Sequence, residues 1–292
     1  MKRVIFAAYK RTVNIFSKTN LRRFRVIDSL NTFIRSRLKP EFIESQGHKI
    51  YLDSNDSLHL SIHKNWEDLE TEIVKKHVSK GDFVLDLGAN IGYYTLLFAK
   101  IVGDSGRVYA FEPDPVNFAL LKKNVEVNNY NNVVLVQKAV SNKSEKSKLY
   151  LCEGNLADHR IYDTHNGRKS IQIETTKLDD FFNDKNIRFD FIKMDIEGAE
   201  GGAVQGMRNI LKRSKNIKII TEFYPEALEG FGIGAREYLN LLLRHNFKFF
   251  MLDEKEKKIR EISAPKLLKE YPKENRKFTN LLCIKKQYPK DF

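Results

Sequence analysis

The sequence predicts an α/β protein built around a doubly wound, mostly parallel sheet. From Gly81 onward, short runs rich in Val, Ile and Phe alternate with helix-length segments, as in βαβ units whose helices cover both sheet faces. A glycine turn follows the first run, and acidic residues recur where later runs end. The predicted strands are 83–86, 107–111, 133–136, 190–194 and 217–223, and the predicted helices are 92–102, 115–128, 203–213 and 235–245.

Residues 1–40 are predicted to form a basic helical arm ahead of the sheet. Eleven Lys and Arg residues stand there against one acid, so the arm carries +10 of the net charge of +13. The rest of the chain is therefore nearly neutral. Pro40 ends the helical pattern. Apolar residues recur at helical spacing at Ile5, Tyr9, Val13 and Phe16, and again at Phe24, Ile27, Ile34 and Leu38.

Residues 41–78 are predicted to lead from the arm into the core. The stretch "EFIESQGHKIYL" suggests a hairpin that turns at Gln46–Gly47, and a helix is expected from Trp66 to Val78. His59 and His63 are four residues apart, but no third metal ligand accompanies them in the sequence. We interpret them as surface histidines and assign no metal site.

Residues 79–292 are predicted to form the main domain, in which the segment 141–176 interrupts the alternation. That segment holds the strand-like stretches "SKLYL" and "SIQIETT" with a polar loop between them. We expect it to cover the carboxyl ends of the strands as a lid. Two late strands, 247–252 and 279–284, are predicted to pair as an antiparallel hairpin at one edge, and "DEKEKKIR" (253–260) is interpreted as a solvated turn.

The composition excludes several classes of protein. Hydrophobic residues make up 41% of the chain and charged residues 30%, which is typical of a globular domain. No run of about 18 apolar residues occurs, so we expect no membrane-spanning helix. The apolar stretch 4–9 is interrupted by Lys10 and Arg11, unlike a signal peptide, and Cys152 and Cys283 make no disulfide framework. We therefore expect a cytoplasmic protein.

The stretch "VLDLGANIGYYTLLFA" (84–99) predicts a strand, a tight turn and a helix. Asp86 ends the strand, and Gly88, Asn90 and Gly92 form the turn, where glycine lets bare backbone approach a ligand. The helix that begins near Gly92 points its amides at the same place. Because Asp86 would repel a pyrophosphate, we expect it to face an ammonium group instead.

Two further predicted strand ends extend this site. Glu112 follows Gly92 by twenty residues, where a carboxylate can accept both hydroxyls of a ribose. After the third strand, "QKAVSN" places Ala139 beside the expected position of an adenine ring. Together with the glycine turn, these residues fit S-adenosylmethionine, which is the cofactor we expect.

Acidic residues also end the fourth and fifth predicted strands. Asp195 and Glu197 follow "FIKM", and Glu222 lies in "IITEFYP". The carboxyl ends of parallel strands meet at the same edge of a sheet, so we expect these acids to share the crevice and Asp195 to contact the cofactor as well. A rim of solvated surface charges is the alternative interpretation.

These stretches together resemble the FkbM-type S-adenosylmethionine-dependent methyltransferases. The similar stretches are "DLGANIGYYTLLFA", "VYAFEPDPVNFALLKKNV", "TTKLDDFF", "DFIKMDIEGAE" and "EFYP", and "NLADHRIYD" (155–163) resembles a subgroup. The resemblance covers roughly residues 81–225. It implies a class I methyltransferase (Rossmann-like) fold and O-methylation of a hydroxyl on a sugar, glycan or secondary metabolite. By position, it implies cofactor contacts for Asp86, Gly88, Asn90, Gly92 and Glu112.

The chain departs from that family after Glu200, where "GGAVQG" holds Gly201, Gly202 and Gly206 in place of large apolar residues. Glycine costs about 1 kcal/mol relative to alanine inside a helix, so we expect the start of this helix to be loosened. The loosening would reach the neighbouring corner at 195–197, which matches the family's acidic strand-end motif. The basic arm is not part of the family's core pattern either.

Methyl transfer to a hydroxyl needs an in-line arrangement and a base that removes the hydroxyl proton. The candidate bases are His159, Asp195, Glu197 and Glu222. His159 has the better intrinsic pKa and lies on the expected lid, whereas Asp195 has the better defined position. Asp158 could orient His159, and Arg160 could bind an acidic sugar or a phosphate. A local ion-paired loop is the alternative interpretation of this "DHR" stretch.

Two other functions stay open. An RNA or other nucleic-acid methyltransferase is disfavoured, because the carboxylates expected in the crevice would repel phosphate. Asp195-Ile-Glu-Gly also stands where amino-directed enzymes carry Asn/Asp-Pro-Pro-Tyr or a similar motif. A non-enzymatic adaptor tethered by its arm is disfavoured by Asp86, Glu112 and Asp195. The expected partner is a small-molecule or glycan acceptor.

The arm at 1–38 has two alternative interpretations. Its helix is basic and aromatic but too short to span a bilayer, which suits the anionic inner face of a membrane. Alternatively, the same apolar positions pack on the catalytic domain or on a second subunit of a homo-oligomer. Deleting the arm would abolish liposome binding in the first case, and would lower thermal stability or change the oligomeric state in the second.

Overall fold

The computed structural model describes residues 34–63, 65–183 and 186–285, together with Phe6 and Tyr9. Residues 34–38 are helical, but most of the two predicted arm helices lies outside the described residues. Within these described ranges, no helix is long and apolar enough to cross a membrane.

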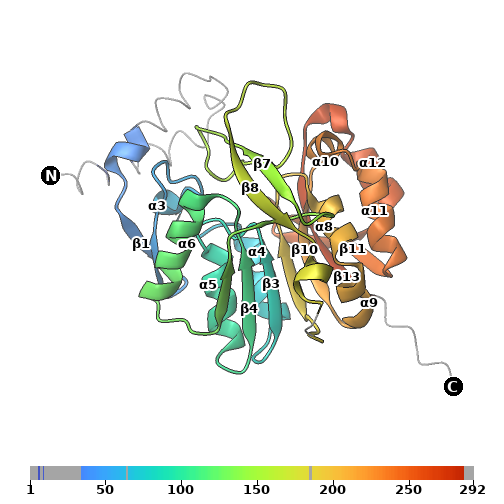
Figure 1. Cartoon of the computed structure of the whole chain (residues 1–292), viewed down its shortest axis with the longest axis horizontal. Helices are drawn as coiled ribbons and strands as arrows, with labels where there is room; N and C mark the ends of the chain where they lie inside the picture. The colour runs from blue at the N-terminus through green and yellow to red at the C-terminus, as the bar shows by residue number, and fades with distance from the viewer. Residues whose placement is uncertain (1–5, 7–8, 10–33, 64, 184–185, 286–292) are drawn as a thin grey trace.

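An eight-stranded mixed sheet forms the centre of the molecule, in the order β12-β11-β13-β10-β9-β3-β4-β5 (Figure 1). Neighbouring strands from β10 to β5 are parallel, whereas β13 is antiparallel to both β10 and β11. This is the mostly parallel sheet of the class I methyltransferase fold. The strands are β3 (Phe83–Leu87), β4 (Arg107–Phe111), β5 (Val133–Val136), β9 (Phe191–Met194), β10 (Lys218–Phe223), β11 (Phe247–Asp253), β12 (Lys258–Ile262) and β13 (Thr279–Lys285).

The chain changes direction across the sheet between β3 and β9. It builds β4 and β5 outward from β3, and then returns to lay β9 against the other side of β3. In open α/β sheets such a topological switch point leaves a crevice at the carboxyl ends of the strands, where ligands bind. The switch point of this sheet therefore lies at the carboxyl ends of β3 and β9, beside the predicted site residues Asp86 and Asp195.

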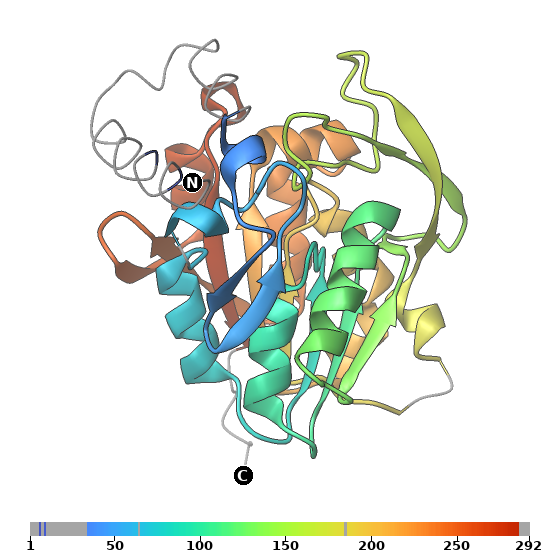
Figure 2. The same cartoon turned by 90° about the vertical axis from the view of Figure 1, so that its left-hand side faces the viewer.

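Helices cover both faces of the sheet, as the apolar strand sequences predict. One face carries α4 (Asp68–His77), α5 (Tyr93–Val102) and α6 (Pro115–Val127). The hairpin of β1 (Phe42–Ser45) and β2 (His48–Tyr51) lies across this layer and confirms the predicted turn (Figure 2). The other face carries α7 (Leu178–Phe181), α8 (Glu200–Gly206), α9 (Arg208–Arg213) and α11 (Ala235–Arg244). The remaining short helices are α3 (Leu60–His63), α10 (Pro225–Phe231), α12 (Ala264–Glu270) and η2 (Lys273–Asn275).

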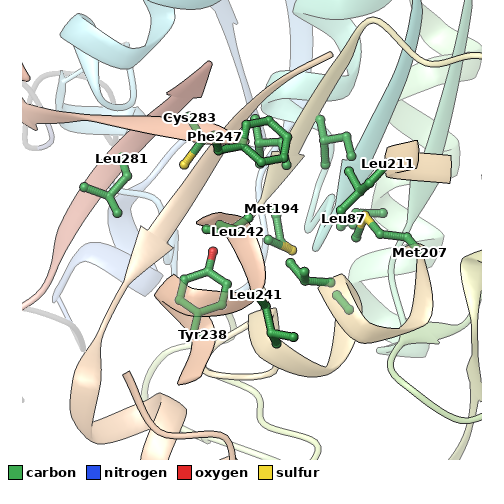
Figure 3. Packing of buried hydrophobic residues seen from close by; sticks show 14 of the residues in the cluster. Leu87, Met194, Met207, Leu211, Tyr238, Leu241, Leu242, Phe247, Leu281 and Cys283 are labelled. Atoms are coloured by element: carbon green, nitrogen blue, oxygen red, sulfur yellow. The ribbon is translucent and has the colours of Figure 1, made fainter. Parts of the chain in front are cut away.

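The two hydrophobic cores follow the alternation of side chains along each strand. Leu87 and Met194 point to the α9 and α11 side, where they pack with Leu211 and Leu242 (Figure 3). Their neighbours Asp86 and Lys193 therefore point to the α4 and α5 side. In both strands the polar side chain thus lies on the α4 and α5 side of the sheet, and the side chains on the other side are apolar.

A second, three-stranded sheet builds the predicted excursion above the strand ends (Figure 1). It contains β6 (Ala139–Val140), β7 (Lys146–Tyr150) and β8 (Ser170–Thr176), which confirms the two strand-like stretches. The loop 151–169 between β7 and β8 is called the lid loop below.

Two predictions about the second half of the domain are wrong in part. Strands β11 and β13 are antiparallel as predicted, but β13 lies inside the sheet and β12 forms the edge. The sequence of β12 is charged, as is typical of edge strands, and so resembles a turn. The single helix predicted at 203–213 begins at Glu200 and breaks at Met207 into α8 and α9.

Candidate functional site

A cavity of about 50 Å³ lies at the switch point, between the strand ends and the lid loop. That volume holds one or two waters, whereas small-ligand sites measure several hundred Å³. The lid loop must therefore move outward before a nucleoside enters. Sheet-side residues of the cavity are Gly88, Asn90, Glu112, Ala139, Asp195 and Glu197, and lid-side residues include Leu149, Leu156, Ala157, His159 and Ile161.

Glu112 is anchored at the tip of β4 by two backbone amides. The Asn90 amide donates to Oε2 over 2.8 Å, and the Asp114 amide donates to Oε1 over 2.9 Å. Each oxygen retains a second lone pair that can accept a ligand hydroxyl. Burial raises the pKa of Glu112 to about 8, so a cationic ligand would stabilise its charged form.

Gly88 and Asn90 bring the turn after β3 against the turn after β9. Gly88 has a φ of +82°, and a Cβ there would lie 1.9 Å from the Asp195 carbonyl oxygen, so only glycine fits. Asn90 is left-handed too, with a φ of +50°. Left-handed non-glycine residues are uncommon and cluster at binding sites. The backbone of this turn therefore adopts left-handed conformations that most residues avoid, at a position where it lines the cavity.

Asp86 and Gly92 lie behind the turn and not on the cavity wall. Asp86 is buried and accepts a hydrogen bond from the Thr95 hydroxyl. Burial raises the pKa of Asp86 to about 6. A Cβ on Gly92 would lie 2.7 Å from Leu121 Cδ1, so this glycine lets α6 pack against α5. A direct cofactor contact by either residue stays a prediction.

Glu200 fixes the acidic corner after β9. Its Oε1 accepts the amide hydrogens of Ile196, at 3.0 Å, and Gly198, at 3.3 Å. Glu197 is left-handed at a φ of +55°. Asp195 and Glu197 both line the cavity, with side chains 34% and 22% exposed. Burial, followed by the charge of Asp195, raises the pKa of Glu197 well above its ordinary value.

The glycines of α8 have a packing reason, and the first turn of the helix is formed; its expected loosening stays a prediction. All three are buried inside a formed helix. A Cβ would lie 2.7 Å from the Phe231 ring at Gly202 and 2.2 Å from the Ser141 carbonyl oxygen at Gly206. At Gly201 a Cβ would lie 2.6 Å from Ile233 Cγ2. The glycines therefore let α8 approach its surroundings more closely than large residues allow.

His159 reaches the cavity from the lid loop, but both its ring nitrogens face protein groups. Nδ1 accepts the amide hydrogen of Cys152 over 3.0 Å, and Nε2 lies 3.9 Å from Asp114 Oδ2. An accepting Nδ1 places the ring hydrogen on Nε2, which leaves no lone pair for a substrate proton in this arrangement. Burial lowers the pKa of His159. His159 can act as a base only if the lid loop rearranges.

Asp158 and Arg160 form an ion-paired loop, the alternative that the sequence left open. Arg160 Nε donates to Asp158 Oδ1 over 2.8 Å, and Arg168 binds the other oxygen at 2.6 Å. Arg160 Nη1 donates to the Tyr162 hydroxyl at 2.8 Å, and Nη2 lies 3.6 Å from Glu197 Oε2. Arg160 thus borders the acidic corner with its donors directed at protein groups. The binding of an acidic acceptor by Arg160 stays a prediction.

Glu222 stands on β10 and does not line the cavity. Its Oε2 is buried and has no hydrogen-bond partner among the residues described. Burial, together with Asp195 and Glu197, raises its pKa well above the ordinary value. The residue therefore contributes to the acidic surroundings of the corner, and a direct part in the reaction stays a prediction.

Two buried polar residues near the cavity were not predicted from the sequence. Asn117 lines the cavity from α6, where Nδ2 donates to the Leu156 carbonyl over 2.8 Å and Oδ1 has no partner within the described chain. Lys193 interrupts the otherwise apolar β9 and contacts Asp195. Only their positions in the sequence could have pointed to them. Asn117 is in the first helical turn after the Glu112 strand, and Lys193 is the one charge in "FIKM".

The lining chemistry fits S-adenosylmethionine. Glu112 offers oxygens to the ribose hydroxyls, and the unpartnered Asn117 carbonyl can accept an amino group. The apolar residues Ala139 and Leu156 can cover a flat ring, and the carboxylates suit a cationic ligand better than a phosphate. Across the ranges that the structure describes, no group of three or more His, Cys, Asp or Glu is arranged to hold a metal ion.

Comparison with known proteins gives two family matches. The methyltransferase FkbM domain family matches residues 86–249, which is more than half of the chain. The family of protein-L-isoaspartate(D-aspartate) O-methyltransferases matches residues 21–140.

Individual relatives are distant. "Methyltransferase 1" of Beauveria bassiana is 27% identical over 145 residues, 43% of this chain and 58% of that protein, so the chain spans little more than half of its length. The 2-O-methyltransferase NoeI of Sinorhizobium fredii is 24% identical over 176 residues, 54% of this chain and 70% of that protein. Among solved structures, an S-adenosylmethionine-dependent O-methyltransferase from Thermotoga maritima is similar with a TM-score of 0.42 and 12% identity, covering 86% of this chain and 79% of that one.

Proposed function

This chain belongs to the family of FkbM-domain methyltransferases, and from that premise we propose that it methylates a hydroxyl oxygen of a sugar, glycan or secondary metabolite. S-adenosylmethionine is the methyl donor. The observation that supports the proposal most directly is that Asp195 and Glu197 line the same cavity as Glu112. A hydroxyl that enters beside the donor thus meets carboxylates that can accept its proton.

Different residues of this chain would bind different parts of the donor. Glu112 would bind the ribose hydroxyls, Asn117 the adenine amino group, and Ala139 the ring face, while Gly88 and Asn90 supply close backbone. When bound, the donor supplies an electrophilic methyl group on a sulfonium sulfur. The lid loop then excludes water, which strengthens each charge interaction inside the site.

Asp195 is the base that the described geometry favours. Its side chain is one-third exposed and the residue lines the cavity, whereas the nitrogens of His159 are engaged. The hydroxyl proton would pass to Asp195 while Glu197 positions the hydroxyl. A placed base contributes about 10²–10⁴-fold in rate. A shift of the lid loop that frees His159 would restore the alternative assignment.

Methyl-labelled S-adenosylmethionine tests the proposal with a panel of neutral polyhydroxylated acceptors and total RNA in parallel. Transfer to a hydroxyl supports it, and label found only in RNA supports the nucleic-acid alternative. Asp195→Asn should then lower turnover at least about 100-fold at matched cofactor affinity, and His159→Ala less than about tenfold. The reverse order of the two variants would make His159 the base.

A further inference from the structure

Lys193 is a buried cation at the carboxyl end of β9 to which the proposed reaction gives no task. Its side chain is 6% exposed. Nζ donates to Asp195 Oδ2 over 3.1 Å and lies 3.4 Å from Glu70 Oε1. A charge this deep is costly unless it is paired, so its presence in an apolar strand needs a reason.

Lys193 belongs to a cluster of polar side chains on one face of the sheet. Asp86 of β3 is its direct register partner, and Glu222 of β10 pairs with Asn280 of β13. Side chains alternate along each strand, so these four residues share the face covered by α4 and α5. The register partner of Lys193 on β10 is the apolar Ile220, so the Glu222–Asn280 pair is offset by two residues from the Asp86–Lys193 pair.

Two acids at the start of α4 lie against this cluster and are held by β13: Glu67 immediately precedes the helix, and Glu70 is in its first turn. Asn280 Nδ2 donates to Glu67 Oε1 over 2.9 Å and to Glu70 Oε2 over 2.8 Å. Tyr94 of α5 donates to Glu67 Oε2, and its ring centroid lies 4.9 Å from Lys193 Nζ. Helix α4 and strand β13 both lie outside residues 86–249, so segments beyond the family match fix the surroundings of this lysine.

The surrounding groups keep Lys193 charged. Burial alone would lower its pKa, but Asp195 and Glu70, with further acids, raise that pKa well above the ordinary value. Burial also raises the pKa values of both neighbouring acids, Glu67 and Glu70, and that of Glu70 lies at about 8. The charged or titratable groups that face Lys193 are Glu67 just before α4, Glu70 of α4, Tyr94 of α5, Asp86 of β3, Asp195 after β9 and Glu222 of β10.

We propose that Lys193 is a positioning residue, which binds Oδ2 of Asp195 and so fixes the carboxylate that receives the acceptor proton. The contact orients the whole carboxylate, and with it the second oxygen, Oδ1. Glu70 holds the lysine from the opposite side. The inference rests on the proposed function only in giving Asp195 its task, because the contact itself can be measured without catalysis.

Carbon-13 NMR of protein labelled in the aspartate carboxyl groups tests the contact directly. The resonance of Asp195 is identified as the one missing in Asp195→Asn. In Lys193→Met this resonance should titrate at higher pH than in the wild type, because a cation 3.1 Å away no longer favours the charged form. Lys193→Arg should return the titration towards the wild-type range.

Turnover gives the second measurement. Lys193→Met should lower kcat about 10- to 100-fold and move the acid limb of the pH–rate profile upward, with a smaller change in affinity for S-adenosylhomocysteine. Lys218→Met is the matched control, because Lys218 lies on the neighbouring β10 and donates to the His77 carbonyl at the other end of the sheet. It should leave both the Asp195 titration and kcat unchanged.

The outcomes separate this inference from the proposed function. An unchanged Asp195 titration in Lys193→Met overturns the inference, whatever the enzyme methylates. A shifted titration in a protein that methylates no hydroxyl supports the contact and overturns the proposed function. If the single variant fails to fold, Lys193→Met with Glu70→Gln avoids leaving an unpaired buried charge, and the same shift is expected.

Discussion

Glu112 shows how one side chain can be prepared for a ligand before the ligand arrives. Its two oxygens are already held by the amides of Asn90 and Asp114, so no side-chain freedom is lost on binding. Those amides come from the turn after β3 and from the start of α6, which are the elements that a strand-end carboxylate meets in this fold. The sequence predicted this residue because strand position alone determines its surroundings.

Replacing Glu112 with alanine is expected to weaken cofactor binding. Two ribose hydroxyls would lose a charged acceptor, a loss of about 1.5–3 kcal/mol, or roughly 10- to 150-fold in Kd. Calorimetric titration with S-adenosylhomocysteine above pH 8, where Glu112 is ionised, measures the effect. Glu126→Ala, at an exposed glutamate on α6, is the control. Equal affinity in both folded variants would remove Glu112 from the cofactor site.

The buried acids also set how stability depends on pH. Burial raises the pKa of Glu70 from its ordinary value of 4.5 to about 8, so its contribution to stability is complete below pH 4.5 and is lost as the pH rises to 8. We expect Tm to fall between pH 5 and 8 and to fall less in Glu70→Gln. Glu72→Gln, at an exposed site on the same helix, should follow the wild type. Parallel curves for all three proteins would contradict this assignment.

Residues whose surroundings depend on distant segments could not be predicted. The importance of Lys193 depends on Glu70 and Asn280, which lie 123 residues before it and 87 residues after it in the numbering. Asn117 depends in the same way on the lid loop at Leu156. His159 was chosen for its intrinsic pKa, but the Cys152 amide that occupies its Nδ1 is visible only in the folded loop.

At the scale of elements, the lid loop is fastened to the turn at 53–57 that precedes the family match. The Leu156 amide donates to Ser57 Oγ over 2.9 Å, and Ser57 Oγ donates to Asp53 Oδ1 over 3.0 Å. Asn55 Nδ2 donates to the Glu153 carbonyl over 3.0 Å. The cavity beneath is too small for a nucleoside while these bonds hold, so opening them is part of binding.

Ser57→Ala is expected to loosen the lid loop. One hydrogen bond of about 1 kcal/mol is lost, so the open state should be populated roughly fivefold more. Amide hydrogen exchange across 152–161 should quicken by a similar factor in the free protein, and cofactor association should quicken with it. Ser54→Ala changes an exposed serine of the same turn and should have no effect. Identical exchange in the two variants would show that Ser57 does not hold the lid.

Element prediction succeeded where periodicity and fold agree. The parallel strands β3, β4 and β5 were located to within one residue at each end, because each is a buried apolar run between polar turns. Strand β12 was missed, since its exposed charged residues show neither an apolar run nor a clear alternation. The break at Met207 follows Gly206, where Ser141 packs too closely for a side chain, and that contact cannot be deduced from local sequence.

At the scale of the whole molecule, the arm connects to the core through Arg35. Its guanidinium is buried, with Nε donating to the Asn55 carbonyl over 3.0 Å and Nη1 lying 2.8 Å from His59 Nδ1. Asn55 and His59 belong to the stretch that also fastens the lid loop. The end of the arm is therefore a packed part of the domain, whatever the residues before it contact.

Two truncations separate the contributions of the arm. Deleting residues 1–38 should lower Tm by several degrees relative to deleting 1–33, because only the longer deletion removes Arg35. Co-sedimentation with anionic vesicles, with neutral vesicles as the control, tests the membrane alternative in both. Binding by the full chain and by neither truncation would identify residues 1–33 as the anchor. Equal Tm values for the two truncations would contradict the structural part assigned to Arg35.

The inward position of β13 has a consequence for how this enzyme can be divided or recombined. A fragment trimmed to residues 86–249 would start inside β3, expose the unpaired edge of β10 and remove both Glu70 and Asn280 from the buried lysine. Exposed strand edges promote aggregation, and stranded interior charges oppose folding. The residues that match the family are therefore not a unit that folds alone. Transferring this enzyme to another protein requires the segments on both sides of 86–249 as well.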